Sequence, residues 1–298
     1  DILCIMNIKK MTDEIEQYLS THTGTERTKK AYRIAYQRLR GVTERNLSDI
    51  SENEILASIK KLSSNLNTQA SYVNIAKCVR MYNGLSILEI EKHRIRLKQK
   101  LVKKRNQGDE SKLDGLATPR ELQSFLNDLY LEEKWRDYII NYLLINYSVR
   151  NKDIDCMIVT STMDTKTHDN FLVVRKKDVS YVRKNYKTSG IYGDLKITIT
   201  SSKFRNAVEK YVLNLEEDKE NFFPLLMKGN GDRIGEDSLF LYITNKTLNN
   251  MTESDICKVN VASIDREGDL NKLQMLSHTR GTSIQTLIGS YHLQSFNF

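Results

Sequence analysis

The chain contains only two prolines, Pro119 and Pro224, among its 298 residues. Proline ends or kinks a helix because it lacks a backbone N–H and its ring clashes with the preceding turn. Helices can therefore run without interruption through almost the whole sequence. Together with the helical spacing of apolar residues over much of the chain, this scarcity predicts a mainly helical fold.

Residues 1–106 are predicted to form a helical module. Its second helix carries one apolar stripe at helical spacing, formed by Tyr32, Ala35, Tyr36 and Leu39. A capping box from Ser51 to Glu54 opens the third helix, and the Asn83-Gly84 pair ends the fourth. The helices are expected over residues 12–21, 25–40, 51–62 and 68–82, and the basic segment 89–105 closes the module.

Positive charge is concentrated in the first two fifths of the chain. Residues 1–117 contain 22 Lys and Arg against 14 Asp and Glu, whereas residues 118–298 contain 24 of each kind. The segment 92–105 alone holds eight Lys and Arg and no acidic residue. Such a run is often a solvated helix face, but charge of a single sign repels itself, and a phosphate backbone offsets that repulsion. We therefore expect double-stranded DNA as a partner, contacted by Arg94, Arg96, Lys98, Lys100, Lys103 and Lys104.

A polar stretch separates this module from a second one. Residues 107–117 contain glycine and polar residues without periodicity, which is typical of a linker. A new helix begins at Thr118, because Thr is a good N-cap, Pro119 suits the first helical position and Glu121 completes a capping box. The predicted organisation is a helical DNA-binding domain at 1–106, a linker at 107–117 and a second domain at 118–298.

The second domain is predicted to combine helices with a small antiparallel β-sheet. A helix over 120–130 is followed by one over 137–147 that is apolar almost all round, which is typical of a buried helix. β-branched and aromatic residues separated by turn residues then predict the strands. These strands are expected within 155–162, 171–187 and 195–200, with a further short strand at 239–243. The remaining helices are expected over 202–216, 269–280 and 283–290.

The sequence lacks the motifs and residue groupings that several classes of functional site require. The cysteines lie far apart and only five histidines are present, so neither a disulfide framework nor a metal centre is indicated. No apolar run approaches the roughly 18 residues that span a membrane. The motifs of phosphate-binding loops, serine hydrolases and zinc proteases do not occur. We expect no cofactor, no metal, no membrane association and no small-molecule substrate. The four cysteines are Cys4, Cys78, Cys156 and Cys257.

Two stretches of the second domain combine cations with a defined local setting. In residues 143–154, LLINYSVRNKDI, an apolar helix ends in a turn that presents Arg150, and Asp153 follows three residues later. In residues 185–190, NYKTSG, Lys187 lies at a predicted hairpin. Both settings would hold a cation close to a folded core.

A third stretch completes the pattern near the end of the sequence. It starts with Arg280-Gly281-Thr282-Ser283 and reaches Tyr291, nine residues after Thr282. In this order, and behind a basic helical module, the three stretches resemble the tyrosine recombinase (phage integrase) family. The spacing from Thr282 to Tyr291 is similar to the family's spacing between its last conserved box and its nucleophilic tyrosine.

The resemblance implies a role for each residue. Tyr291 would be the nucleophile that forms a 3′-phosphotyrosyl link with DNA. Arg150 would bind phosphate oxygens through its planar fork, and Lys187 would protonate the leaving 5′ oxygen as a general acid. Asp153 would orient Arg150, and no metal would be needed. The neighbouring cations that could replace Lys187 are Arg183 and Lys184.

Two positions depart from the family pattern. The family carries a second catalytic arginine where this chain has Cys257, and the nearest cation, Lys258, is a candidate substitute. The His or Trp of the last box is Thr282 in this sequence. Loss of one phosphate-binding donor typically costs about 2–4 kcal/mol of transition-state stabilisation. An arginine restored at position 257 is therefore expected to raise the cleavage rate by roughly one to three decades.

The resemblance implies an N-terminal SAM-like core-binding domain and a C-terminal catalytic domain that together recombine or integrate DNA at specific sites. It further implies a homotetramer on two synapsed DNA duplexes. The Arg-Gly-Thr-Ser box is similar to versions carried by large DNA viruses and related mobile elements. A reducing intracellular compartment with DNA, such as host cytoplasm, a viral factory or the nucleus, fits the unpaired cysteines better than secretion.

Two alternatives share these features. The first is a catalytically weakened or inactive relative that only binds DNA, which Cys257 and Thr282 favour. The second is a type IB topoisomerase, which shares the tyrosine chemistry but relaxes DNA as a monomer. The separate basic module at the start of the chain favours a recombinase over a topoisomerase.

Overall fold

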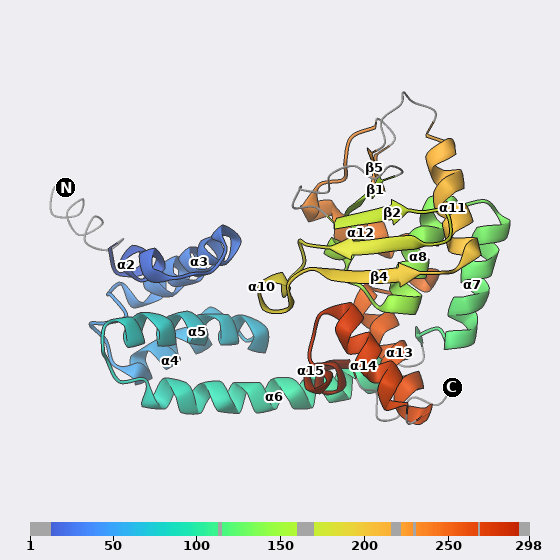
Figure 1. Cartoon of the computed structure of the whole chain (residues 1–298). Coiled ribbons are helices and arrows are strands. Elements are labelled where there is room, and N and C mark those ends of the chain that lie inside the picture. Colours follow the sequence, from blue (N-terminus) through green and yellow to red (C-terminus); the bar gives the residue numbers. More distant parts are fainter. Residues whose placement is uncertain are drawn as a thin grey trace. The chain divides into compact units, whose positions relative to one another are not determined.

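The computed structural model describes residues 13–112, 115–159, 170–215, 222–228, 231–267 and 269–291 (Figure 1). The chain divides into two compact units, Asp1–Asp109 and Glu110–Phe298. We refer to them as unit 1 and unit 2. The described part is mainly helical with one small sheet, in agreement with the fold class expected from the residues.

Unit 1 is a bundle of helices around one apolar core. The predicted stripe forms part of that core: Tyr36 and Leu39 are buried, and Tyr32 and Ala35 pack against it. The predicted capping box is confirmed, because Ser51 accepts from the backbone N–H of Glu54 and the Glu54 carboxylate accepts from the backbone of Ser51. The helices are α2 (Asp13–Thr21), α3 (Glu26–Thr43), α4 (Glu52–Leu62), α5 (Leu66–Tyr82) and α6 (Leu88–Lys112).

Helix α6 continues through most of the segment that we expected to be a linker. Residues 107–112 of this segment are helical, and residues 113–114 lie outside the described part. The division between the two compact units falls between Asp109 and Glu110, within the expected linker, and the assignment of a linker stays a prediction. Gln, Glu and Lys in this segment are good helix formers, and a single glycine in a helix costs only about 1 kcal/mol relative to alanine. A helix does not require an apolar stripe along its whole length, so the absence of periodicity did not exclude a helix here.

The basic residues of α6 differ in their surroundings. Arg96, Lys98, Lys100, Lys103 and Lys104 are exposed. Arg94 is half-buried and donates two hydrogen bonds to the Glu91 carboxylate, at 2.9 and 2.6 Å. At about 100° per residue, Arg96, Lys100 and Lys103 lie within about 60° of one another on the helix, and Lys98 lies on another side. One face of α6 thus presents at least three cations to solvent.

Unit 2 begins with two helices that position its core. The predicted capping box of α7 (Pro119–Leu131) is present, with Thr118 and Glu121 exchanging hydrogen bonds. Helix α8 (Trp135–Tyr147) is buried on most sides, as its apolar sequence predicts. A left-handed residue, Ser148, ends α8 and leads into the short helix α9 (Asn151–Ile154).

The sheet of unit 2 has five strands in the order β4-β3-β2-β1-β5. Antiparallel pairs join β2 to β3, β3 to β4 and β1 to β5, but β1 pairs with β2 in parallel. The sheet is therefore mixed, which corrects our expectation of a wholly antiparallel sheet. Side chains alternate between faces in either kind of strand, so residue pattern gives no strand direction. The strands are β1 (Cys156–Val159), β2 (Asn170–Val174), β3 (Val179–Arg183), β4 (Leu195–Ile199) and β5 (Phe222–Pro224).

Two segments that we expected to be strands, residues 239–243 and 160–162, do not add strands to the described part of the chain. Residues 239–243, expected as a strand, lie inside the helix α12 (Glu236–Thr244). Leu239 and Ile243 are buried four residues apart while Phe240 and Leu241 are exposed, which is a helical pattern. A short apolar run fits either structure, and only the burial of its side chains decides between them. Residues 160–162, expected at the end of a strand, lie outside the described part.

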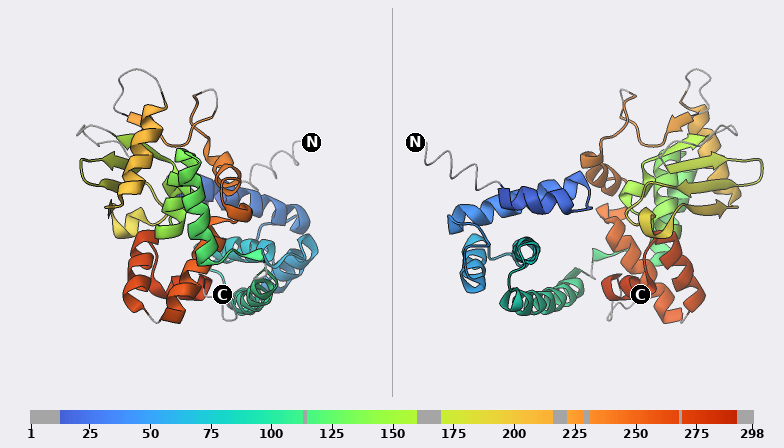
Figure 2. Two further views of the ribbon diagram at one scale, coloured as in Figure 1. Left: turned by 90° about the vertical axis from the view of Figure 1, so that its right-hand side faces the viewer. Right: turned by 60° about the vertical axis from the view of Figure 1, so that its left-hand side comes forward.

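Most of the remaining helices of unit 2 pack on α8 or on one another. Helices α7 and α11 pack on α8 beside the sheet, while α13, α14 and α15 pack on one another (Figures 1 and 2). Helix α14 begins with a side-chain cap from Asp269 and ends at a left-handed Gly281, as predicted. The elements not yet introduced are α10 (Ser189–Tyr192), α11 (Ser202–Leu213), the 3-10 turn η2 (Leu248–Asn250), α13 (Glu253–Glu267), α14 (Leu270–Arg280) and α15 (Ile284–Tyr291).

Within the described residues, no helix has both the length and the apolar character that crossing a membrane requires.

Candidate functional site

The turn after α8 is held in place by two distant helices. Ser148 has a φ of 47°, a left-handed conformation that is uncommon for residues other than glycine. Its hydroxyl accepts a hydrogen bond from Asn260 of α13 at 2.8 Å. Its carbonyl accepts from Nη1 of Arg280, at the end of α14, at 2.5 Å. These contacts determine where the chain emerges at Arg150.

Arg150 points toward the end of α14. Its Nη1 donates to the backbone carbonyl of Arg280 at 2.7 Å, and its side chain is partly exposed. Its backbone N–H donates to Oδ2 of Asp153 at 3.3 Å. Asp153 thus orients Arg150 through the backbone at the start of α9.

The Asp153 carboxylate forms its ion pair with another arginine. Nη1 of Arg183, at the end of β3, lies 2.9 Å from Oδ2 of Asp153, and both side chains are fully buried. Nη2 of Arg183 also donates to the carbonyl of Thr279 in α14. Arg183, which we considered as an alternative to Lys187, is therefore enclosed in the core and joins α9, β3 and α14.

Arg280 is the residue that brings the candidate tyrosine into the cluster. Its Nη2 donates to Oη of Tyr291 at 2.9 Å and lies 3.2 Å from Oε1 of Glu253. Its Cζ lies 4.6 Å from the centre of the Tyr291 ring, which is a cation–π contact. The side chain of Arg280 is only 1% exposed. Burial acts to lower the pKa of Arg280, but Cys257, Tyr291 and Glu253 beside it raise that pKa overall.

Glu253 connects the first turn of α13 to the start of α9. One carboxylate oxygen accepts from Nη2 of Arg280, and the other accepts from the backbone N–H of Asn151. Its negative charge therefore compensates a buried guanidinium. Glu253, Arg150, Arg280 and Tyr291 form one cluster, which we name the arginine–tyrosine cluster.

The loop between β3 and β4 packs directly on this cluster at Gly281. The hydroxyl of Thr188 donates to the Gly281 carbonyl at 2.6 Å. Gly281 has a φ of 61°, and a Cβ added there would lie 2.8 Å from the Tyr186 ring, so only glycine fits. Lys187 stands between these two contacting residues and is exposed. Lys184 is partly buried, with its Nζ 5.9 Å from the centre of the Phe171 ring.

The two positions that depart from the family pattern lie next to the cluster. Cys257 is fully buried in a small apolar cluster with Val261, Leu273, Leu276 and Leu287. Burial raises the pKa of the Cys257 thiol to about 11, so the group is neutral at pH 7. Lys258 follows on α13 and is partly exposed. Thr282 contributes its backbone, since its N–H donates to Ser277 and its carbonyl accepts from the Ser277 hydroxyl.

The structure thus brings Arg150 and Tyr291 together through Arg280, with Asp153 behind them and the Lys187 loop alongside. Our reading of the residues did not assign a role to Arg280 or Glu253. The sequence signal for Arg280 was its place directly before Gly281. That signal is weak, because an arginine before a C-capping glycine is also typical of an ordinary helix end. Chemically, the cluster presents the Arg280 guanidinium at a tyrosine hydroxyl and the Arg150 guanidinium at the Arg280 backbone, a setting that suits an oxyanion or phosphate.

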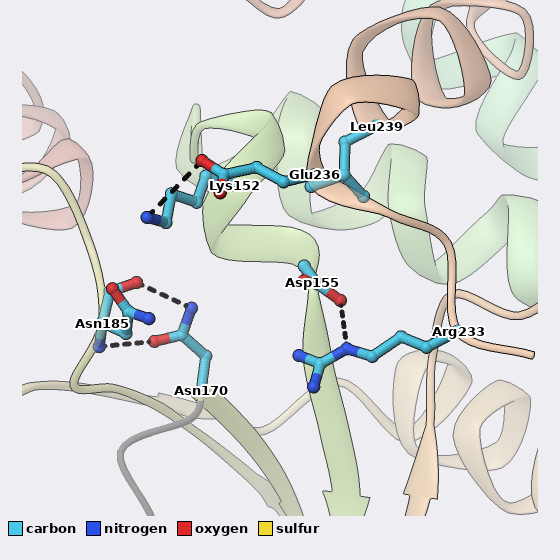
Figure 3. Close-up of a pocket in the computed structure, with 7 residues that line it drawn as sticks. All are labelled: Lys152, Asp155, Asn170, Asn185, Arg233, Glu236 and Leu239. Carbon is cyan, nitrogen blue, oxygen red and sulfur yellow. Dashed lines mark hydrogen bonds and ion pairs between the residues drawn. The ribbon is translucent and has the colours of Figure 1, made fainter. Parts of the chain in front are cut away.

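A polar pocket of about 210 Å³ lies beside α9 (Figure 3). Its charged groups already face one another: Lys152 lies 3.7 Å from Glu236, and Arg233 lies 2.9 Å from Asp155. Asn170 accepts from the backbone N–H groups of Lys184 and Asn185, which anchors the start of the β3–β4 loop. Asn170, which lines the pocket, therefore helps to hold the loop that carries Lys187. Among the residues described, no three His, Cys, Asp or Glu side chains gather as metal ligands would.

Comparison with known proteins finds likeness among solved structures alone. No protein-family model matches the chain, and no curated protein matches it. Among solved structures, the crystal structure of XerA recombinase is similar over 97% of this chain and 94% of the XerA chain. The identity is 14% and the TM-score is 0.41.

The burial of Cys257 changes the outcome that we expect for arginine at this position. Cys257→Arg would add a guanidinium to an apolar cluster beside Arg280, without a new carboxylate to compensate it. An uncompensated buried charge typically costs about 3–5 kcal/mol. We therefore expect a thermal unfolding midpoint lower by roughly 6 °C or more, measured by calorimetry, rather than a faster reaction.

The matched control is Lys258→Arg, which places an arginine one residue further along α13 at a partly exposed position. Its midpoint should stay close to that of the wild type, because surface substitutions usually change stability by less than about 0.5 kcal/mol. A Cys257→Arg variant as stable as this control would contradict the expectation.

Proposed function

We propose that the protein is a tyrosine-type DNA strand transferase, a site-specific recombinase or integrase that cleaves and rejoins duplex DNA. The observation that carries this proposal is the 2.9 Å hydrogen bond between Arg280 and Oη of Tyr291, with Arg150 bonded to the Arg280 backbone. A phenol held by a guanidinium is a suitable nucleophile toward a phosphodiester, because the same donors stabilise charge on the phosphate oxygens.

In the proposed step, Oη of Tyr291 attacks the phosphorus of the scissile phosphate. An Oη–P bond forms, the phenol proton passes to solvent, and the bond from phosphorus to the 5′ oxygen breaks. The 5′ oxygen takes a proton from the ammonium of Lys187, which leaves a free 5′ hydroxyl and a 3′-phosphotyrosyl link. The reverse reaction, with a 5′ hydroxyl from another strand, rejoins DNA without hydrolysis.

The position of Lys187 supports its role as the general acid over Lys184. Lys187 is exposed, and its neighbours Tyr186 and Thr188 contact Gly281, which follows Arg280. The Lys184 ammonium lies over the Phe171 ring instead. An exposed cation on a loop packed against the cluster can approach a leaving oxygen there.

The wider assignments follow from this chemistry. We propose that unit 1 is the core-binding domain, which holds duplex DNA through the exposed cations of α6, and that unit 2 is the catalytic domain. Strand exchange between two duplexes would require a homotetramer, as in the family that the sequence resembles. We also propose a viral or mobile-element origin and a DNA-containing intracellular compartment.

Tyr291→Phe is expected to abolish covalent protein–DNA adducts on a nicked duplex while leaving DNA affinity unchanged. Only the nucleophilic oxygen is lost, and the ring remains over Arg280. Adducts are measured by denaturing gel and affinity by a shift assay. The control Tyr192→Phe removes an exposed hydroxyl from α10 and should keep the wild-type adduct yield. Adducts at wild-type yield in Tyr291→Phe would place the nucleophile elsewhere, and binding without adducts in the wild type would favour a DNA-binding relative.

Lys187→Ala is expected to slow adduct formation by about 10²–10⁴-fold, the range typical for loss of a general acid. Replacing the bridging 5′ oxygen of the scissile phosphate by sulfur should restore most of the rate, since a thiolate leaves without a proton. Lys184→Ala is the matched control and should behave as wild type on both duplexes. If the sulfur-containing duplex restores Lys184→Ala instead, the general acid is Lys184.

Neutralising the cationic face of α6 is expected to flatten the salt dependence of DNA binding. Each lost phosphate contact removes roughly 0.9 from the slope of log K against log[salt], so Arg96, Lys100 and Lys103 changed to Gln should remove up to about 2.7. The control changes the exposed cations Arg175, Lys176 and Lys177, at the turn between β2 and β3, to Gln. An equal change of slope in both variants would contradict a specific role for α6.

A further inference from the structure

We propose that Asn170 is a positioning residue for the general acid. Its side-chain amide holds the start of the loop that carries Lys187, so protonation of the leaving 5′ oxygen depends on a residue at the start of another strand, β2. This inference rests on the proposed strand-transfer function and on the role of Lys187 within it.

The Asn170 amide uses every hydrogen-bonding position that it has. The residue is only 2% exposed. Its Oδ1 accepts from the backbone N–H groups of Lys184 and Asn185, each at 3.0 Å. Its Nδ2 donates to the Asn185 carbonyl at 3.1 Å and to the Asp153 carbonyl at 3.4 Å. An asparagine amide has two acceptor and two donor positions, so these four bonds determine how the side chain is turned.

The amide extends the anchored backbone beyond the end of a strand. Strand β3 pairs with β2 as far as Val182 and ends at Arg183. The N–H and the carbonyl of Asn185 both bond to the Asn170 side chain instead, as Figure 3 shows. The side chain thus replaces a partner strand at Asn185, which lies two residues before Lys187.

Lys187 consequently lies between two anchored points. Asn185 is held before it, and the Thr188 hydroxyl donates to the Gly281 carbonyl after it, at 2.6 Å. The Lys187 side chain itself is exposed. Loss of the first anchor would let the loop pivot about the second, and a displacement of about 1 Å at a reacting group can reduce a rate by about 10²-fold.

The same amide relates the acid to the phosphate-binding group. The Asp153 carbonyl accepts from Nδ2 of Asn170, and the Asp153 carboxylate accepts from the backbone N–H of Arg150. Asp153 is fully buried, so it is a fixed point in the core of unit 2. Lys187 and Arg150 are therefore both placed relative to Asp153, and Asn170 supplies the link on the side of the acid.

The experiment measures single-turnover adduct formation by wild type and Asn170→Ala on two nicked duplexes. One duplex has an ordinary scissile phosphate, and in the other sulfur replaces the bridging 5′ oxygen. We expect Asn170→Ala to react up to about 10²-fold more slowly than wild type on the ordinary duplex, because the acid is misplaced. On the sulfur duplex its rate should lie within about threefold of wild type, since a thiolate leaves without a proton.

Rescue by sulfur separates a positioning role from a structural one, because partial unfolding lowers the rate on both duplexes by the same factor. The matched control is Asn141→Ala. Asn141 is also buried, and its Nδ2 donates to the carbonyls of Asp137 and Lys246, both at 2.8 Å. Any loss in this control should be equal on the two duplexes. If Asn170→Ala does not fold, Asn170→Asp gives the same comparison, because it keeps the side-chain shape but loses both amide donors.

The double variant with Lys187→Ala gives an independent readout. On the ordinary duplex, Asn170→Ala combined with Lys187→Ala should react at the rate of Lys187→Ala alone. The two substitutions are then non-additive, because the positioning residue has no acid left to position.

Three results would overturn the inference. An equal loss on both duplexes would make Asn170 a structural residue. A wild-type rate for Asn170→Ala on the ordinary duplex would show that Lys187 does not need this anchor. An undiminished further loss in the Lys187→Ala background would mean that the amide acts on another group. Failure of the proposed function looks different, because the wild type would then form no adduct on either duplex.

Discussion

The buried ion pair between Asp153 and Arg183 holds together the parts of unit 2 on which the site depends. The two side chains are fully buried at 2.9 Å, and removing one partner of such a pair typically costs about 3–5 kcal/mol. Asp153 also accepts from the backbone of Arg150, and Arg183 also donates to the carbonyl of Thr279. One interaction therefore fixes the start of α9, the end of β3 and the end of α14, and these are the segments that carry Arg150, the Lys187 loop and Arg280.

The second constraint is the tight turn at Gly281. Because its backbone is left-handed and the Tyr186 ring approaches it closely, α15 can fold back and place Tyr291 against Arg280. The same close approach brings the β3–β4 loop to the cluster. The Tyr291 hydroxyl, the guanidinium groups of Arg150 and Arg280 and the loop that carries Lys187 thus meet because two connections are short and tightly packed. The residues of the candidate site therefore lie on or beside these connections, while α8 and the sheet provide the rigid support.

Local patterns were the most predictable part of the fold. The capping boxes at Ser51 and Thr118, the buried helix α8 and the ends of α14 all depend on residues within a few positions of one another. Errors arose where local pattern is ambiguous. The apolar run 239–243 fits a strand or a helix, the polar end of α6 lacks any stripe, and the parallel pairing of β1 with β2 is invisible in side-chain alternation.

The sequence by itself supplied the candidates Arg150, Asp153, Lys187 and Tyr291 through the resemblance of three ordered stretches to a known family, and their roles stay predictions. It also located the positive charge in the first module. Only the tertiary structure decided that Asp153 pairs with Arg183, that Cys257 is enclosed by apolar side chains, and that Arg280 bonds to Tyr291 and Glu253. The physical reason is distance along the chain: Arg280 contacts Ser148 and Arg150 across 132 and 130 residues, and no local pattern encodes such contacts.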